Sequence, residues 1–148
     1  MRVAVVSDEP HAVHAEIIGL LEARGCEVVP FGALKTGGDV EWAPAAEEAA
    51  LAVSSGSCDE GVFLCWTGTG VSIAANKVAG IRAALCADPE TAAGARIWNH
   101  ANVICLSNRT LSADLAEQIL TTWFDTAPGD KGAAGVALLE GVESRHRR

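Results

Sequence analysis

One segment of the chain carries the residue types and spacing best suited to chemistry. Residues 61–77 read GVFLCWTGTGVSIAANK: an apolar run, then Cys65, then a turn containing Gly68 and Gly70, then helix-forming residues from Ser72. A strand, a glycine-rich turn and a helix start together direct backbone N–H groups toward an anion. A thiol at the strand end lies near the positive end of the helix dipole, which favours the thiolate. The segment therefore predicts a group that transfers protons, beside backbone N–H groups that stabilise negative charge formed during a reaction. The alternative interpretation is a tight turn next to a buried cysteine without a chemical role.

Other polar side chains fall where strands are expected to end or begin; they are Asp8, Thr67, Thr69, His100 and Arg109. The two threonine hydroxyls can meet a ligand or bond within the turn. Asp8 can cap a helix or contact a ligand, and Arg109 can pair with a phosphate or with a surface carboxylate. His100 is expected in a loop at the active edge. The turn lacks both a Walker motif and a complete GxGxxG, which argues against a nucleotide site.

Length and composition exclude several classes of protein. The chain has 148 residues, of which 49% are hydrophobic and 20% charged, so one globular domain spanning 1–148 is expected. A net charge of −8 argues against nucleic acid as a partner, and no apolar run is long enough for a membrane helix. The chain starts directly on a strand-like run, so a signal peptide is not expected. Five scattered cysteines without a CxxC pair argue against a metal site and against disulfides, and favour the reduced cytoplasm.

Hydrophobic periodicity predicts strands that alternate with helices. The expected strands are 2–6, 26–31, 62–64, 81–87 and 102–107, and the expected helices are 11–24, 42–54, 89–98, 112–124 and 132–148, with a loop at 32–41. This order predicts an α/β fold, a Rossmann-like three-layer α/β/α sandwich around a five-stranded parallel sheet. Ligands bind such sheets at the carboxyl ends of the strands. We therefore expect Asp8, residues 65–70, Asp88 and residues 107–109 to share one edge.

The central motif is also similar to a known family signature. CWTGTGVSIAANK at 65–77, followed by GIRA at 80–83, resembles the type B ribose-5-phosphate isomerase and galactose-6-phosphate isomerase family. The resemblance extends in order over nearly the whole chain. It implies an α/β/α sandwich and a homodimer or homotetramer with active sites at the subunit interface. It also implies a small sugar phosphate as substrate, and neither a metal ion nor an organic cofactor.

The resemblance further implies aldose–ketose isomerisation through an enediolate. On the family pattern Cys65 is the base that moves a proton between two neighbouring carbons. Thr67 assists proton transfer at the oxygens, and the turn amides around Gly68 and Gly70 stabilise the enediolate charge. Substrate contacts are expected from a larger set of residues: Asp8, Glu9, Trp66, Gly68, Thr69, Gly70, Ser72, Trp98, Asn99, His100, Arg109 and Lys131.

Five positions depart from the family pattern. Glu9 stands where the family has histidine, Trp66 where it has glycine, and Trp98 where it has the histidine that opens the sugar ring. Toward the C-terminus the chain offers only Lys131 and Gly135 near the positions of the family's phosphate-binding arginines. The proton-transfer residues are thus kept, while the ring-opening group and part of the phosphate site are changed. Both indoles are expected to narrow or reshape the pocket.

Three functions are consistent with this pattern. The first is an isomerase of the same reaction type acting on a shorter or acyclic sugar phosphate. The second is a non-catalytic sugar-binding or metabolite-binding relative. The third is ordinary ribose 5-phosphate isomerisation, with His100 or His11 replacing the lost histidine. We also expect Cys65 to be the only thiol that is both accessible and acidic, and the C-terminal helix at about 131–148 to pack on a partner subunit.

Overall fold

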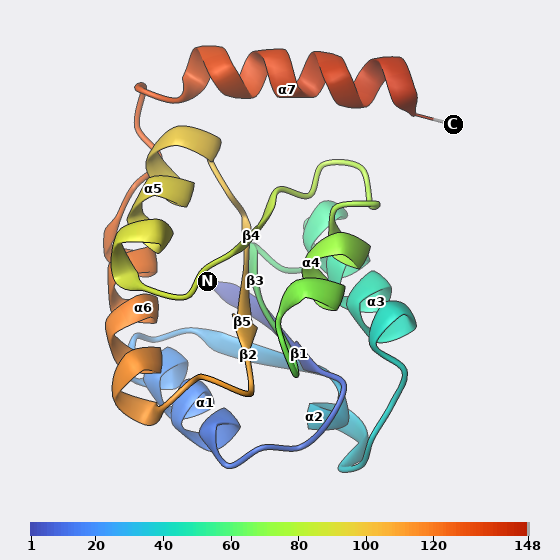
Figure 1. Ribbon diagram of the computed structural model, residues 1–148, viewed down its shortest axis with the longest axis vertical. Coiled ribbons are helices and arrows are strands. Elements are labelled where there is room, and N and C mark those ends of the chain that lie inside the picture. Colours follow the sequence, from blue (N-terminus) through green and yellow to red (C-terminus); the bar gives the residue numbers. More distant parts are fainter. Residues whose placement is uncertain (148) are drawn as a thin grey trace.

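The computed structural model describes residues 1–147 and consists of a parallel sheet between two layers of helices (Figure 1). The strands are β1 (Arg2–Ser7), β2 (Glu27–Gly32), β3 (Glu60–Cys65), β4 (Ala83–Leu85) and β5 (Val103–Ser107). Their order in the sheet is β2-β1-β3-β5-β4, and every pair is parallel. The predicted α/β sandwich with a five-stranded parallel sheet is therefore confirmed.

Seven helices complete the described chain: α1 (Val13–Ala23), α2 (Ala33–Thr36), α3 (Trp42–Ser54), α4 (Thr69–Ala75), α5 (Pro89–Asn99), α6 (Ala113–Asp125) and α7 (Ala133–His146). Helices α1, α5 and α6 cover one face of the sheet, and α3 and α4 cover the other. Helix α7 lies apart, across the edge where the strands begin (Figure 1).

The strands alternate their side chains between the two apolar layers. In β3, Val62 and Leu64 pack toward α1, α5 and α6, while Phe63 and Cys65 pack toward α3 and α4. A strand covered on both faces reads as a continuous apolar run, which is the pattern expected for a parallel sheet. The same alternation places the thiol of Cys65 on the α3/α4 side of the strand end.

Several predicted boundaries are wrong, and each has a local reason. The expected loop at 32–41 contains the single turn α2, and β4 is only three residues long instead of spanning 81–87. Helix α1 begins at Val13 with Ala12 at its N-cap and no side-chain cap, so Asp8 does not cap it. Asp88 does cap α5, accepting a hydrogen bond from Thr91 N at 2.7 Å. The end of the last expected helix, Arg148, lies outside the described residues.

Helix α7 covers little of the protein. Val136 is its one buried residue, whereas Leu138 is 75% exposed and Leu139 and Val142 are also exposed. Glu143 fixes the helix by accepting a hydrogen bond from Gly80 N at 2.9 Å. Within residues 1–147, no helix has the length and apolarity needed to cross a membrane.

Candidate functional site

The carboxyl ends of β1, β3 and β5 meet at one edge of the sheet. Ser7 pairs with Leu64, and Cys65 pairs with Ser107, so Asp8 follows β1 at the level of Cys65. This edge lies at the bottom of Figure 1, where the chain leaves each strand. The order β2-β1-β3 also puts the reversal of strand order between β1 and β3, where open α/β sheets bind ligands. The predicted grouping at this edge is confirmed.

Backbone hydrogen bonds hold the end of β3 firmly in place. The N–H of Asn108 donates to Cys65 O at 2.9 Å, and the N–H of Arg109 donates to Trp66 O at 3.0 Å. The Ser107 hydroxyl donates to the same Trp66 oxygen at 2.8 Å. Cys65 itself is only 5% exposed, so its thiol is packed in a defined position rather than moving freely in solvent.

The turn after Cys65 depends on the absence of a side chain at Gly68. This residue has φ +77°, and a Cβ there would lie 2.6 Å from Leu85 Cδ1 and 3.0 Å from the Leu106 carbonyl. Only glycine fits both the conformation and the space. The turn brings the hydroxyls of Thr67 and Thr69 to 2.6 Å from each other, and α4 starts at Thr69.

Ser72 and Trp42 also lie on the α4 side of this turn. Burial raises the pKa of the Cys105 thiol, and a hydrogen bond with the Ser72 side chain lowers it by less. The indole of Trp42, at the start of α3, packs so closely on Gly70 that a Cβ there would meet the ring at 3.0 Å. Sequence reasoning missed Trp42; its signal is an aromatic residue that opens a helix right after a glycine-containing loop.

The prediction that Cys65 is the only thiol both accessible and acidic is wrong about its accessibility. All five cysteines are free, and Cys26 is half-buried, whereas Cys65 is buried. Burial raises the pKa of Cys58 and Cys105, and it raises the pKa of Cys86 to about 11. Those three thiols are therefore poor sources of thiolate. Among residues 1–147, no group of three or more His, Cys, Asp or Glu side chains is arranged to hold a metal ion.

Asp8 supplies a carboxylate without a partner. Its Oδ1 is buried and accepts no hydrogen bond from any residue in the described range 1–147. Burial raises its pKa, and the neighbouring carboxylates of Glu9 and Asp39 raise it further. Buried polar atoms in native proteins nearly always have a partner. An unsatisfied carboxylate oxygen beside Cys65 is therefore placed to receive a hydrogen bond from a bound hydroxyl group.

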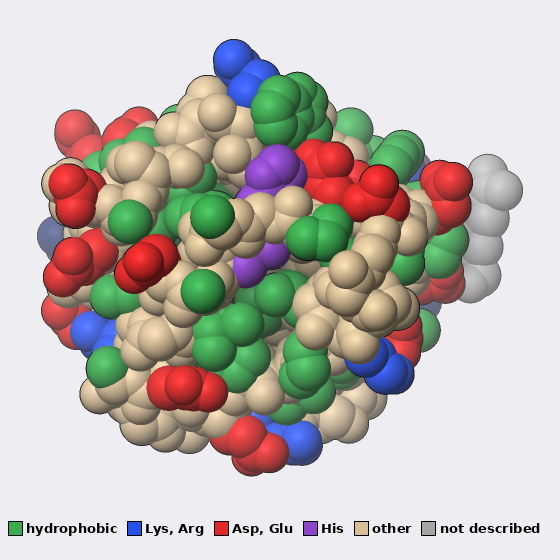
Figure 2. Space-filling view, turned by 90° about the horizontal axis from the view of Figure 1, so that it is seen from below, with side chains coloured by type: hydrophobic (Ala, Val, Ile, Leu, Met, Phe, Trp, Pro, Cys, Tyr) green, Lys and Arg blue, Asp and Glu red, His purple; other side chains and the backbone are tan. Residues whose placement is uncertain are grey.

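A second group of side chains lies on the other side of the same strand end. His11 Nε2 is 2.9 Å from Glu9 Oε1, and the His11 ring stacks on Trp66 with centroids 5.8 Å apart and planes at 27°. Figure 2, which looks onto this edge, shows histidine side chains bordered by hydrophobic and acidic ones. The Trp66 ring, 51% exposed, thus stacks on His11 at the surface of this edge.

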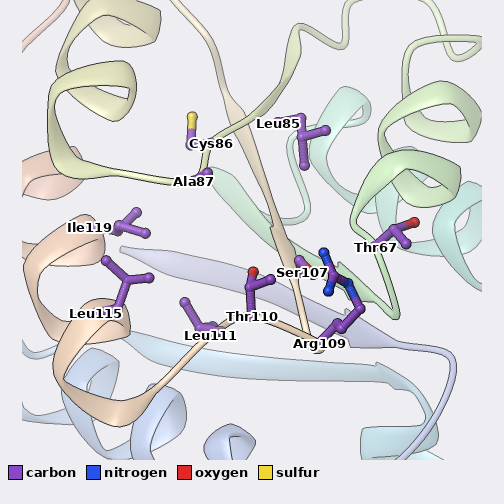
Figure 3. A pocket seen from close by; sticks show the side chains of 10 residues that line it. All are labelled: Thr67, Leu85, Cys86, Ala87, Ser107, Arg109, Thr110, Leu111, Leu115 and Ile119. Carbon is purple, nitrogen blue, oxygen red and sulfur yellow. The ribbon is translucent and has the colours of Figure 1, made fainter.

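Arg109 borders a cavity of about 220 Å³ on the α6 side of this edge. Thr67, Ser107 and Thr110 contribute hydroxyls to its wall, and Leu111, Leu115 and Ile119 make the rest of it apolar. In Figure 3 the Arg109 side chain points toward Thr67 and Ser107. One cation among hydroxyls can hold the anionic end of a small molecule.

Four of the expected site residues lie at the opposite edge of the sheet, so the prediction that His100 lies at the active edge is wrong. Helix α5 runs back from the end of β4 and places Trp98, Asn99 and His100 where β5 begins. The His100 carbonyl accepts a hydrogen bond from Arg82 Nε at 2.8 Å, at the start of β4. Lys131 lies at this same edge, since a Cβ at the next residue, Gly132, would lie 2.6 Å from the Trp98 carbonyl oxygen.

A parallel α/β sheet with a fixed thiol, an unpaired carboxylate and a glycine turn at its carboxyl edge defines an enzyme of the α/β class. The family model described as Ribose/Galactose Isomerase matches residues 3–137. The chain therefore belongs to the ribose/galactose isomerase family.

Individual relatives agree with this assignment. The chain is 36% identical to ribose-5-phosphate isomerase B of Escherichia coli, over 88% of this chain and 87% of that protein. It is 37% identical to D-erythrulose-4-phosphate isomerase of Pectobacterium atrosepticum, over 80% of this chain and 78% of that protein. Among solved structures, ribose-5-phosphate isomerase B of Clostridium thermocellum superposes with a TM-score of 0.90 at 38% identity, over 99% of both chains.

Proposed function

We propose that the protein is an aldose–ketose isomerase that converts a sugar phosphate through an enediolate, with Cys65 as the base. The observation that carries this proposal is the grouping at the carboxyl edge of three features: the buried Cys65 thiol, on a residue whose backbone carbonyl accepts the Asn108 N–H, the partnerless Asp8 oxygen and the Gly68 turn. Family membership supports the reaction class.

The reaction moves one proton between carbons and one between oxygens. The Cys65 thiolate removes the proton from the carbon beside the carbonyl and returns it to the neighbouring carbon. The Thr67 hydroxyl, held by Thr69 at 2.6 Å, assists proton transfer at the two oxygens. The amides around Gly68 and Gly70 stabilise the negative charge of the enediolate. Asp8 receives a substrate hydroxyl and so orients the carbon chain.

The functional unit is proposed to be a homodimer or homotetramer with shared active sites. Within one chain, Trp98, Asn99, His100 and Lys131 lie at the opposite edge of the sheet from Cys65, so they can reach only the site of another copy. Helix α7 is at the same edge and exposes Leu138, Leu139 and Val142. In a two-fold interface, these apolar side chains would be covered as the two edges meet.

The proposed substrate is a short, open-chain sugar phosphate. Trp98 stands at the position of the family's ring-opening histidine, and an indole N–H donates a hydrogen bond but cannot act as a base. A four-carbon sugar with phosphate on its terminal oxygen cannot close the usual five-membered ring, so it needs no ring opening. The similarity to an enzyme named for a four-carbon sugar phosphate, D-erythrulose 4-phosphate, supports this choice.

A side-by-side rate comparison tests the substrate. We expect kcat/KM to be higher for erythrose 4-phosphate than for ribose 5-phosphate, by about tenfold or more, since acid–base ring opening contributes at least that much. Trp98→His should then raise the rate with ribose 5-phosphate by about tenfold and leave the four-carbon rate unchanged.

His100→Ala is the control variant in that comparison. Efficient use of ribose 5-phosphate that survives loss of His100 would contradict the open-chain substrate. Efficient use that disappears in His100→Ala would show instead that the ring-opening histidine has moved two positions along the α5–β5 connection. Turnover of neither sugar would favour a non-catalytic sugar-binding relative.

A further inference from the structure

Arg96 and Glu60 form a buried ion pair at the amino edge of the sheet. Glu60 is the first residue of β3, at the opposite end of that strand from Cys65, and Arg96 lies in the last turn of α5. Arg96 Nη2 is 2.9 Å from Glu60 Oε1, and the two side chains are 11% and 10% exposed. Burying an ion pair often adds no stability, because desolvation of the charges costs as much as their attraction returns. Stability alone therefore does not account for a charge pair at this position.

The other nitrogens of the Arg96 guanidinium hold two backbone carbonyls. Nη1 donates to Ala101 O at 2.7 Å, in the α5–β5 connection, and Nε donates to Thr126 O at 3.2 Å, directly after α6. The guanidinium also lies 4.8 Å from the ring centroid of Trp123, whose Nε1–H donates to Glu60 Oε2 at 2.8 Å. All three guanidinium nitrogens and both carboxylate oxygens are thus engaged, so the planar guanidinium has one fixed orientation.

The two carbonyls belong to the two segments that carry the expected site residues of the amino edge. Ala101 comes directly after the segment 98–100, and Thr126 begins the connection that leads to Lys131. His100 has φ +46°, a conformation that residues other than glycine seldom adopt and that persists only where its surroundings hold it. The guanidinium holds the carbonyl of the very next residue. One side chain therefore fixes the course of both segments.

We propose that Arg96 is a positioning residue for the shared active site. It holds both segments in the orientation in which another copy of the chain receives them at its carboxyl edge. This inference rests on the proposed function and extends it to side chains that touch no substrate. Arg96 is buried and lies at the far end of β3 from Cys65, so it acts only through the segments whose carbonyls it holds.

The test variants remove the two carbonyl bonds without leaving an unpaired buried charge. Arg96→Lys keeps a positive charge beside Glu60, but a single ammonium group does not reproduce the planar fork that reaches two carbonyls and a carboxylate together. If this variant does not fold, the double substitution of Arg96→Met with Glu60→Gln removes both charges and keeps an acceptor for the Trp123 N–H. We expect turnover of erythrose 4-phosphate to fall about tenfold or more, because small misplacements of site residues are costly. Near-normal turnover would overturn the proposal.

Arg24→Lys is the matched control. The Arg24 guanidinium pairs with Asp125 and lies 5.6 Å from the ring centroid of Phe124, so it has the same kinds of partner at the end of α6. Among residues 1–147 it bonds to neither of the two carbonyls. This variant should turn over erythrose 4-phosphate like the wild type.

Mixed dimers give a readout that a merely structural defect would not move. Arg96→Lys mixed with Cys65→Ser forms one site from an intact carboxyl edge and an intact amino edge, so about a quarter of wild-type activity should return. Arg96→Lys mixed with Asn99→Ala forms no such site, so activity should stay at the level of the components. Recovery with Asn99→Ala would overturn the proposal. So would the absence of recovery with Cys65→Ser under conditions where Asn99→Ala does recover with it.

Hydrogen exchange separates this proposal from the proposed function, because it needs no substrate. Mass spectrometry follows amide exchange in the segments 98–102 and 122–126, which include the Ala101 and Thr126 N–H groups bonded to Ala95 O and Trp123 O. Exchange should be about tenfold faster or more in Arg96→Lys, the effect of losing a hydrogen bond from a charged group, and unchanged in β1. Unchanged exchange in both segments would overturn the proposal. If the wild-type protein isomerises no sugar phosphate, the proposed function fails, while exchange still decides whether Arg96 holds these segments.

Discussion

The two edges of the sheet differ in how completely their side chains are satisfied. At the carboxyl edge, hydrogen bonds hold the backbone of Cys65, Trp66 and His11, and one carboxylate oxygen, on Asp8, is left without a partner. At the amino edge, His100 Nε2 is buried without a partner among residues 1–147, Trp98 is 57% exposed, and α7 presents an apolar face. The first edge is the proposed active site. The second is the surface proposed to meet another copy of the chain.

This contrast explains why one chain contains all the expected site residues yet cannot assemble them. A helix that connects two parallel strands must carry the chain back from the carboxyl edge to the amino edge. Residues at the end of α5 are therefore separated from Cys65 by the length of the sheet, however close they are to β5 in sequence. Bringing a second copy's amino edge to the first copy's carboxyl edge would remove the separation, as the proposed shared site requires.

Replacing the thiol should have the largest effect. Cys65→Ser exchanges a thiolate for a hydroxyl, a far weaker base, and should lower kcat about a thousandfold without unfolding the protein. Turnover of erythrose 4-phosphate and thermal unfolding measure the two quantities. Cys26→Ser is the matched control, since Cys26 is half-buried and lies at the start of β2. Near-normal turnover in Cys65→Ser would mean that another group is the base. The carboxyl edge would then no longer be marked as the one that carries the chemistry.

Mixing two inactive variants tests whether the edges work together across subunits. Asn99→Ala removes an exposed side chain at the amino edge and should lower activity at least tenfold if that side chain completes a partner's site. Mixed dimers of Cys65→Ser with Asn99→Ala would contain one intact site. After unfolding and refolding the mixture, about a quarter of wild-type activity should return, because half of the dimers are mixed and each has half its sites intact.

The same experiment has a clear negative outcome. If the mixture stays as inactive as its components while size-exclusion chromatography shows mixed dimers, the edges do not share a site. A fully active monomer would contradict the shared site in a different way, by showing that the carboxyl edge is sufficient alone.

Much of this organisation could be read from the sequence because it follows from periodicity. Apolar runs bounded by glycine and proline predicted the sheet, and the parallel order then predicted that Asp8, Cys65 and Arg109 share an edge. The same rule also gives the true place of His100, because a residue just before a strand lies at the amino edge. The prediction that His100 lies at the active edge is wrong for this reason.

Contacts between distant segments could not be predicted in this way. His14 and Asn108 are 94 residues apart, and nothing in the local pattern of either segment marks them as partners. The packing of Trp42 on Gly70 likewise depends on how α3 and the turn meet in space. The single turn α2 is too short to produce a hydrophobic period, so the sequence predicts only a loop there.

The smallest expected effect concerns the buried hydrogen bond between His14 and Asn108, beneath the carboxyl edge. Burial lowers the pKa of His14 below its usual value of 6.5. The unfolded chain therefore takes up a proton as the pH falls below about 6.5, while the folded protein keeps His14 neutral. The contribution of neutral His14 to the free energy of unfolding is fully present above that pH. It is lost as the pH falls toward the lowered pKa, with a slope of at most about 1.4 kcal/mol per pH unit from this one group.

His14→Gln should flatten this slope, since an amide keeps a donor for Asn108 and does not titrate. Urea unfolding at a series of pH values between about 7 and 5 measures the free energy of unfolding and therefore this slope. His146→Gln, at the exposed end of α7, should leave the slope as it is in the wild type. An equal slope in His14→Gln and wild type would mean that another group is responsible.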